Sequence, residues 1–541
     1  MHPRATRASG KYPKVILNRV LAFSGKSRLV THMRFRTITQ LLLFSAFTLS
    51  AQAAVSLPAD GAAALPTGGA GPAKEAIDAF QAGRHAKAVE LAKPLAEKGN
   101  ADALYLMGFA HETGKGAEGS RDKALEFYRK AAALKHKDAI YRLSLILLAS
   151  DKEQERAQAK EALESAAKDD PTIAGRILGE AYLRGLLTPT AAPDQAIFWW
   201  KRAAEAGDIP SLLLVARFYE GQFGFPELKN NTEALANYSK AAGLGDAGAM
   251  AALGSRLLNG DEKTRDEAKG REWLKKAIAG KEYSAYLALG DYEENVKKNL
   301  KAALNEYERG KDVGQIDCIL RTADFYMEGK GVEKDTARGV ALIEKAAEAG
   351  SPVASYRLAV QVLSADKPDL VTGYKYLIAA ASGNIPEAQN ELGLFYLSGK
   401  LGGVDGPAGV AWLTRSAQGG FAKAQNNLGT LYERGAAGLP QNIENAGQLY
   451  TLAANQGSGP ATLSLARLTY LGIGTKADPV KAWALATIAQ ERGEEAAKQL
   501  VDEITAKLDD KQKAAARQEL ADIKSNKAAA KPAAPAAPAK K

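Results

Sequence analysis

Several short stretches of the sequence have residue types and spacings that enzymes use for chemistry. Residues 114–119, Gly-Lys-Gly-Ala-Glu-Gly, match the glycine pattern of a dinucleotide-binding site. Such a site needs a strand before the glycines, so that the backbone can approach a pyrophosphate group. The residues before Gly114 have the periodicity of a helix instead, and similar glycine pairs recur after other helical stretches. We therefore interpret this motif as a turn.

Two serine–lysine pairs, Ser120 with Lys123 and Ser165 with Lys168, have the S-x-x-K spacing of penicillin-recognising serine enzymes. The S-D-N and K-T-G motifs that complete those active sites do not occur in the sequence. Because a catalytic serine needs its partner groups, neither pair predicts an active site.

Histidine and cysteine are too sparse to suggest a metal site. His85, His111 and His136 are the histidines beyond the first 53 residues, and no two of them have ligand spacing such as H-x-x-x-H. His111 stands where equivalent stretches have tyrosine, which predicts a packed core histidine. Cys318 is the single cysteine, which excludes an intramolecular disulfide, and its helical pattern predicts burial. The sequence thus predicts no catalytic residue, no cofactor, no metal and a protein that is not an enzyme.

Aromatic residues could in principle stack on sugars or fill gaps between helices. The residues concerned are Phe127, Tyr128, Trp199, Trp200, Trp273, Trp412 and Trp483. Because their positions coincide with those expected to pack between helices, we interpret them as packing residues. A sugar-binding platform is the alternative.

A block that reads Ala, four residues, Gly or Ala, two residues, Tyr recurs at intervals of about 36 residues. Its second small residue falls at Gly108, Ser144, Gly179, Ala216, Gly254, Gly290, Ala323, Ala359, Gly393, Gly429 and Ala466. So regular an interval is typical of a repeat protein, in which each unit contacts its neighbours.

Each unit is expected to be a pair of helices joined by a turn. In residues 424–457 the first helix carries Ala424, Leu428, Gly429 and Tyr432 on one face. After a turn, the second helix carries Ala446, Tyr450, Ala453 and Ala454 at helical spacing. Small residues let two helix backbones approach closely, and an aromatic ring fills the gap toward the next pair. Asp122, Asp194 and Asp335 stand near the start of second helices, where they can cap free amide groups.

The composite pattern resembles the Sel-one-like repeat, a relative of the tetratricopeptide repeat, over about Ala103 to Gly493. It reads Ala-x-x-x-Leu-Gly-x-x-Tyr-x-x-Gly-x-Gly-Val, then Asp, then Ala-x-x-(Trp/Tyr)-x-x-(Lys/Arg)-Ala-Ala-x-x-Gly. The resemblance implies an all-α fold, an α-solenoid (right-handed superhelix) of about 11–12 helix-turn-helix repeats of about 36 residues. Two repeats depart from the pattern: the charged residues 151–156 replace one turn, and the turn after Tyr219 is longer.

The first helices of such a solenoid line a concave groove, which typically binds peptides or protein partners. Polar residues on the side of these helices opposite the apolar stripe are therefore the candidate partner-binding residues. They are Arg176, Glu180, Arg217, Arg321, Asp324, Asn390, Glu391, Asn426 and Asn427. An ordinary solvated surface is the alternative for each of them.

The formal net charge of +10 is concentrated at the two ends of the chain. Residues 1–53 hold nine Lys or Arg and no acidic residue, whereas residues 54–523 hold 58 basic and 62 acidic residues. A nucleic-acid partner, which would favour a basic folded body, is therefore not expected.

The N-terminal part of the chain is expected to lie outside the repeats. Residues 33–53 resemble a secretory signal peptide, with two arginines, an apolar core and Ala-Gln-Ala at the cleavage site. A mitochondrial presequence is the alternative. Residues 1–32 fit no part of a signal peptide, so we expect synthesis to start at Met33. Residues 54–73 form an Ala/Gly/Pro-rich linker. We thus expect a periplasmic or secreted bacterial protein without membrane insertion after signal removal.

The rest of the chain divides into four parts. We expect residues 74–98 to form an N-terminal helix hairpin and residues 99–493 to form the repeats. Residues 494–525 are expected to form capping helices. Residues 526–541 form an Ala/Pro/Lys tail that we expect to be disordered and whose basic charge suits contact with a cell wall.

The resemblance and the lack of catalytic motifs together predict an exported, non-enzymatic scaffold or adaptor that binds protein or peptide partners. Proteins similar to this family serve in envelope assembly, secretion, polysaccharide export and signalling, and the resemblance does not choose among them. The alternative is a protein that binds or hydrolyses a cell-wall glycan on the same solenoid.

Overall fold

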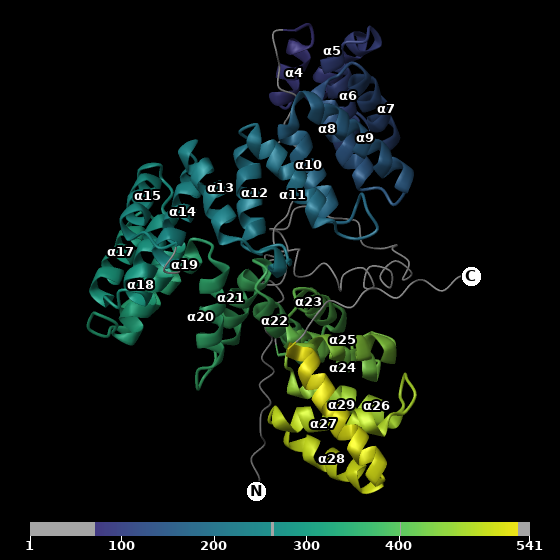
Figure 1. Ribbon diagram of the computed structural model, residues 1–541, viewed down its shortest axis with the longest axis vertical. Coiled ribbons are helices and arrows are strands. Elements are labelled where there is room, and N and C mark those ends of the chain that lie inside the picture. The colour runs from purple at the N-terminus through teal and green to yellow at the C-terminus, as the bar shows by residue number, and fades with distance from the viewer. Residues whose placement is uncertain (1–70, 261–263, 401, 529–541) are drawn as a thin grey trace, which may run out of the picture. The chain divides into compact units, whose positions relative to one another are not determined.

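The computed structural model describes residues 71–260, 264–400 and 402–528 (Figure 1). Within these residues the chain forms 26 α-helices, α4 to α29, one 3₁₀ turn at Pro226–Leu228 and no strand. None of these helices is both long enough and apolar enough to cross a membrane. The expected signal peptide (33–53), the segment before it and most of the linker (54–73) lie outside the described residues.

The helices form pairs along the chain as far as α27, and α28 and α29 continue the order but pack on α27 rather than extensively on each other. The first helices are α4 (Lys74–Gln81), α6 (Ala101–Thr113), α8 (Lys137–Leu148), α10 (Pro171–Leu183), α12 (Ile209–Tyr219), α14 (Ala247–Asn259), α16 (Ser284–Asn295), α18 (Ile316–Glu328), α20 (Pro352–Leu363), α22 (Pro386–Ser398), α24 (Ala422–Arg434), α26 (Gly459–Leu471) and α28 (Glu495–Lys507). The second helices are α5 (His85–Glu97), α7 (Arg121–Ala133), α9 (Glu153–Asp169), α11 (Pro193–Glu205), α13 (Asn231–Gly243), α15 (Glu267–Ala279), α17 (Leu300–Asp312), α19 (Thr336–Glu348), α21 (Leu370–Ser382), α23 (Gly406–Gln418), α25 (Ile443–Asn455), α27 (Pro479–Glu491) and α29 (Asp510–Ala528).

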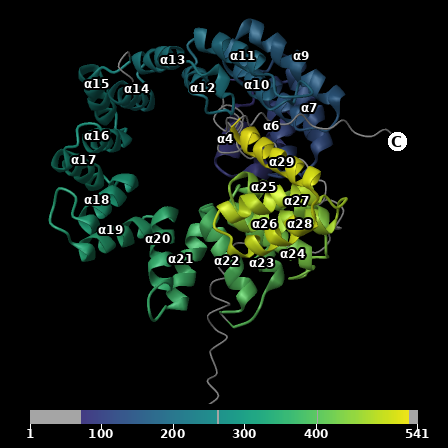
Figure 2. The same ribbon diagram turned by 60° about the horizontal axis from the view of Figure 1, so that its bottom comes forward.

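Contacts between helices follow their order in the chain. From α4 to α27, each second helix packs on the first helix of its own pair and on the first helix of the next pair (Figure 2). This arrangement is an all-α solenoid of helix-turn-helix units, which confirms the predicted fold class.

In several repeats a small residue of the first helix faces a ring of the second helix, and in others, such as that of Gly254, it faces a leucine. A Cβ atom at Gly108 would lie 2.6 Å from the Tyr128 ring, and one at Gly179 would lie 2.3 Å from Trp200. The Trp200 ring also reaches Phe218 of the next pair, with centroids 6.2 Å apart. Glycine therefore lets the two helices of a pair approach, and the ring links that pair to the next one.

Several of these buried tyrosines share a hydrogen bond that the sequence analysis did not foresee. The hydroxyl groups of Tyr128, Tyr238 and Tyr450 donate to Glu112, Glu220 and Glu433, respectively, at 2.6, 3.0 and 2.6 Å. Each glutamate lies four residues after the small residue of the facing first helix. The repeat thus provides an acceptor for a phenol group that burial would otherwise leave unpaired.

The turns confirm the interpretation of the glycine-rich motif. Gly114 ends α6 with φ of 67°, and Gly116 follows with φ of 80°, in the left-handed region that favours glycine. The motif follows a helix, as expected for a turn and not for a dinucleotide site. Both His111 and Cys318 are buried, as predicted.

Three local expectations need correction. The charged stretch 151–156 is not simply a replaced turn, because α9 starts at Glu153 and extends to 17 residues. Asp335 caps α19 by accepting from the backbone of Arg338 at 2.9 Å. Asp122 and Asp194, in contrast, lie inside the first turns of α7 and α11. There they oppose the helix dipole but leave the cap position to another residue.

The last two helices both pack on α27. Ile504 of α28 and Ala516 of α29 belong to one buried cluster with Ala482 of α27. Lys524 of α29 forms an ion pair of 2.7 Å with Glu491, the last residue of α27. The side of α28 that faces away from α27 carries mainly charged and amide side chains, so it gives another repeat no apolar surface to pack on.

Candidate interaction surface on the first helices

The candidate partner-binding residues occupy three equivalent places on the first helices. Relative to the small residue of each repeat, they stand three or two residues before it, or one residue after it. We call the side chains at these three places the first-helix face. One first helix approaches the next at this face, so its side chains can contact each other across repeats.

The nine residues differ in exposure. Arg217, Arg321 and Glu391 are exposed, Asp324, Asn426 and Asn427 are half-buried, and Arg176, Glu180 and Asn390 are buried. The last three depart from the expected solvated face, because packing between adjacent repeats covers their side chains. Six of the nine residues therefore remain accessible to a partner.

Arg176 and Glu180 form part of a buried charged group on α10. The Arg176 guanidinium lies 3.8 Å from the Asp208 carboxylate, which caps α12, and Arg184 contacts Glu180 at 2.5 Å. Burial raises the pKa of Glu180, and the neighbouring Arg184 partly opposes that shift. These charges link elements of the solenoid, so their present role is structural.

Two ion pairs join consecutive first helices farther along the chain. Arg321 of α18 lies 3.4 Å from Asp291 of α16, and Arg357 of α20 contacts Asp324 of α18. In both pairs the arginine stands two residues before its small residue, and the aspartate stands one residue after the small residue of the preceding repeat. We call this recurring arrangement the first-helix ladder. Sequence reasoning missed it, although aligning the repeats would have placed the opposite charges in register.

A different pair joins α22 and α24. The Asn427 side-chain amide donates to the Asn390 carbonyl oxygen at 3.0 Å, and Asn390 donates to Glu391 at 3.3 Å. Three of the predicted residues are therefore brought together in one hydrogen-bonded group. Asn426 lies on the same helix but is not part of this group.

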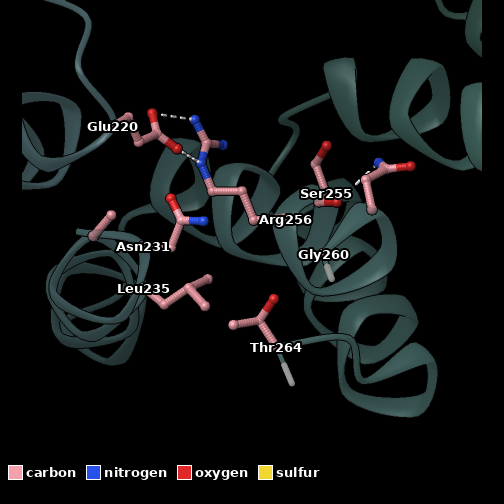
Figure 3. A pocket seen from close by; sticks show the side chains of 9 residues that line it. Glu220, Asn231, Leu235, Ser255, Arg256, Gly260 and Thr264 are labelled. Atoms are coloured by element: carbon pink, nitrogen blue, oxygen red, sulfur yellow. Dashed lines mark hydrogen bonds and ion pairs between the residues drawn. The ribbon is translucent and has the colours of Figure 1, made fainter. Parts of the chain in front are cut away.

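A pocket of about 440 Å³ opens near the ends of α12 and α14 (Figure 3). Glu220 and Arg256 line it and bind each other, with 2.7 Å between Arg256 Nη2 and Glu220 Oε2. Arg256 also lies over the Tyr238 ring, 4.3 Å from its centroid. The charged groups of this pocket are thus engaged with each other, and the pocket offers no poised base or nucleophile. Within the described residues, no group of three or more His, Cys, Asp or Glu side chains is placed to hold a metal ion.

The aromatic residues are used in packing. Trp200 is fully buried and Trp199 nearly so. The exposed sides of Trp273 and Trp412 are covered by Lys276 and Arg415, whose charged groups lie 4.5 and 4.7 Å from the ring centroids. Because the rings of Trp273 and Trp412 are also partly buried against apolar clusters of neighbouring helices, the structure favours packing over the sugar-binding alternative.

Comparison with known proteins agrees with this architecture. The family model described as Sel1 repeat matches residues 101–136, 176–208, 209–246, 247–281, 316–351, 386–421, 422–458 and 460–493, just over half of the chain. The pairs α8/α9, α16/α17 and α20/α21 lie largely outside these matches but have the same helical architecture.

Two curated yeast proteins are similar to parts of the chain. Chitin synthase regulatory factor 3 of Schizosaccharomyces pombe is 28% identical over 235 residues, which are 35% of this chain and 25% of that protein. Chitin synthase regulator SKT5 of Saccharomyces cerevisiae is 27% identical over 239 residues, which are 41% of this chain and 34% of that protein. The chain therefore spans about a quarter to a third of the length of these relatives.

Two solved bacterial structures are among those that match the chain. The c5321 protective antigen of uropathogenic Escherichia coli, which displays an SLR fold, is 22% identical with a TM-score of 0.44, covering 84% of this chain and 99% of that one. A Sel1 repeat protein from Oxalobacter formigenes is 25% identical with a TM-score of 0.39, covering 60% and 93%. The extent of the family match, together with the helix pairs described above, shows that this chain belongs to the Sel1 repeat family.

Proposed function

We propose that this protein is an exported, non-enzymatic scaffold that binds protein partners through its first-helix face in cell-envelope assembly, secretion or signalling. The observation that carries the proposal is the first-helix face itself. It presents exposed polar side chains on several repeats, such as Arg217 on α12, Arg321 on α18 and Glu391 on α22. Repeat proteins use such extended surfaces to bind other proteins.

Two further points support a scaffold. The curated relatives are named as regulators, and the charged groups of the pocket in Figure 3 are occupied by each other. A catalytic site would instead need a convergent set of groups with perturbed pKa values at an open position.

The binding surface can be tested by capture from an envelope extract with the purified chain. The triple variant Arg217→Ala, Arg321→Ala, Asn427→Ala should lose partners that the wild type retains, because it removes side chains from the first-helix face. The matched control, Arg129→Ala, Glu344→Ala, Lys375→Ala, changes three exposed residues on second helices. Equal capture by both triple variants, with helix content unchanged in circular dichroism, would contradict the proposed surface.

Export is a separate part of the proposal, supported by the signal-like residues 33–53. N-terminal sequencing of the protein from an expressing bacterium should give a first residue near Ala54. A cellular protein that retains Met1 would contradict export by this route.

A glycan-acting protein is the alternative. Purified chain should release no soluble products from peptidoglycan when no other protein is present. Product release by the chain alone would replace the scaffold proposal by an enzyme.

A further inference from the structure

The residue before a first helix often caps that helix with its side chain. Among the described helices, α6, α10, α12, α14, α18, α20 and α26 are capped in this way by Asn, Asp, Gln or Ser. At α8 the place is taken by His136, whose Nδ1 atom accepts a hydrogen bond of 3.2 Å from the backbone N–H of Ala139. Of these residue types, histidine alone ordinarily changes charge between about pH 5 and 8. The cap of α8 therefore differs from the others in its response to pH.

The position of the proton on the His136 ring follows from this cap. A ring nitrogen accepts a hydrogen bond only when it carries no proton, so the neutral ring that caps α8 holds its proton on Nε2. The Nε2 atom lies 3.3 Å from Oδ1 of Asp102 on α6. The ring also stacks on Tyr105 of α6, with centroids 4.8 Å apart. His136 thus links the start of α8 to two residues of α6.

Asp102 supplies the negative charge in contact with the ring. Its carboxylate favours a charged imidazole, whereas the N-terminus of α8 disfavours one because of the helix dipole. Burial raises the pKa of Tyr105 to about 12, so this residue stays neutral near pH 7. Arg142 of α8 is engaged with Glu112 at 2.8 Å. The other charged residues near the start of α8 are Lys135, Lys137 and Asp138. A proton that enters this ring therefore has Asp102 as its counter-charge.

Protonation changes which of these contacts His136 can keep. The added hydrogen lies on Nδ1, where it meets the N–H donor of Ala139, and two donors cannot bond each other. The Nε2–H group still faces the Asp102 carboxylate, and the positive charge strengthens that contact. We propose that His136 is a pH-dependent joint, which ties α8 to α6 when neutral and releases the first turn of α8 when charged. This inference does not depend on the proposed function.

The release is expected to stay within the first turn of α8. Another tie at this turn is the 3.1 Å pair of Lys137 with Asp170, in which 64% of the Lys137 side chain is exposed. Such exposed pairs stabilise little, so this one does not replace the cap. Farther along α8, Tyr141 and Leu147 are buried and hold the helix in the repeat. Loss of the cap can thus free the first turn without unfolding the repeat.

The test is hydrogen exchange of single amides in the full chain, measured by mass spectrometry with electron-transfer fragmentation at about pH 7.5 and about pH 5. Each rate is compared with the intrinsic rate at the same pH to give a protection factor. The protection of Ala139 should fall about fivefold at the lower pH, as expected for loss of an N-cap. The matched control lies in the same chain: the amide of Ala103 on α6 donates to Asn100 at 2.8 Å and should keep its protection.

Substitutions of His136 separate the cap from the charge. His136→Asn keeps an acceptor that does not titrate, so the protection of Ala139 should be the same at both pH values. His136→Ala should leave Ala139 weakly protected at both. NMR of protein with isotope-labelled histidine should show an Nε2–H tautomer at the higher pH and a doubly protonated ring at the lower one. An Nδ1–H tautomer, a ring that stays neutral at about pH 5, or unchanged protection of Ala139 once the ring is charged would overturn the inference.

Discussion

In a repeat such as that of Gly179, glycine is needed because the neighbouring helix leaves no room for a Cβ atom, and not because of its backbone angles. Gly179 lies within α10, where any residue could adopt the backbone angles. A Cβ atom added at this position, however, would lie 2.3 Å from Nε1 of Trp200 and 2.9 Å from the backbone carbonyl oxygen of Ala196. The carbonyl belongs to a helix backbone and cannot rotate away. At the residue scale, glycine therefore sets how closely the two helices of a pair approach.

Replacing Gly179 with Ala should destabilise the protein by about 2 kcal/mol, within the usual cost of overpacking a core. Gly447→Ala is the control, because this glycine lies within α25 and no atom of a neighbouring element is within 4 Å of its Cβ place. That change should be neutral or should stabilise by about 0.5–1 kcal/mol, since alanine favours the helix. Urea denaturation, monitored by circular dichroism, measures the free energy of unfolding of both variants. Equal effects of the two substitutions would show that close approach is not the cause.

At the scale of a helix, a side-chain cap fixes the start of many of the second helices, and α19 is an example. The Asp335 side chain accepts from the backbone of Arg338 and ends the turn that follows Gly331. It satisfies a donor that α19 could not satisfy by itself. Similar caps from Asp405 and Asp478 begin α23 and α27, so the same device fixes where the second helix starts in several repeats.

Asp335→Ala should cost about 1 kcal/mol in the free energy of unfolding, the typical value for loss of an N-cap. Asp335→Asn should stay close to the wild type, because asparagine offers the same acceptor. The measurement is the urea midpoint of the full chain, with hydrogen exchange of α19 as a local readout. If Asn were as destabilising as Ala, the charge and not the cap would be the important property.

The helices and their pairing could be predicted from the sequence because each repeat carries its own signals. Gly429 and Tyr450, for example, are buried on α24 and α25, on the helix faces that their spacing indicated. The exposure of the first-helix face could not be predicted in the same way. Whether Asn390 is buried or Arg217 exposed depends on how one first helix lies against the next, and a single repeat contains no information on that approach. The packing of α29 on α27 was likewise not evident, since α29 lies outside the matched repeats and does not carry their pattern.

At the scale of the whole molecule, burial of tyrosines links stability to alkaline pH. Burial is the main cause that raises the pKa of Tyr105, Tyr141, Tyr238 and Tyr450 to about 12, from an ordinary value near 10. These four residues lie in different repeats. Their effects on the free energy of unfolding should therefore add.

Below about pH 10, ionisation of these tyrosines should not affect the free energy of unfolding. The free energy of unfolding should fall as the pH rises from about 10 to about 12. In that window the unfolded chain releases its phenol protons while the folded chain still holds them, so unfolding becomes more favourable. Urea midpoints measured between pH 8 and pH 11 test this, with absorbance at about 295 nm reporting ionisation. Tyr450→Phe should make the dependence shallower. If all four tyrosines were ionised at about pH 10 while the helix content stayed unchanged, the raised pKa values would be contradicted.

Among the helices that the structure describes, extensive contacts join only those that are at most two places apart in the chain. From α4 to α29, therefore, a helix does not need a segment distant in the sequence to bury its apolar side. A newly made chain can therefore complete its structure progressively as it emerges from a ribosome, with little loop closure to slow it.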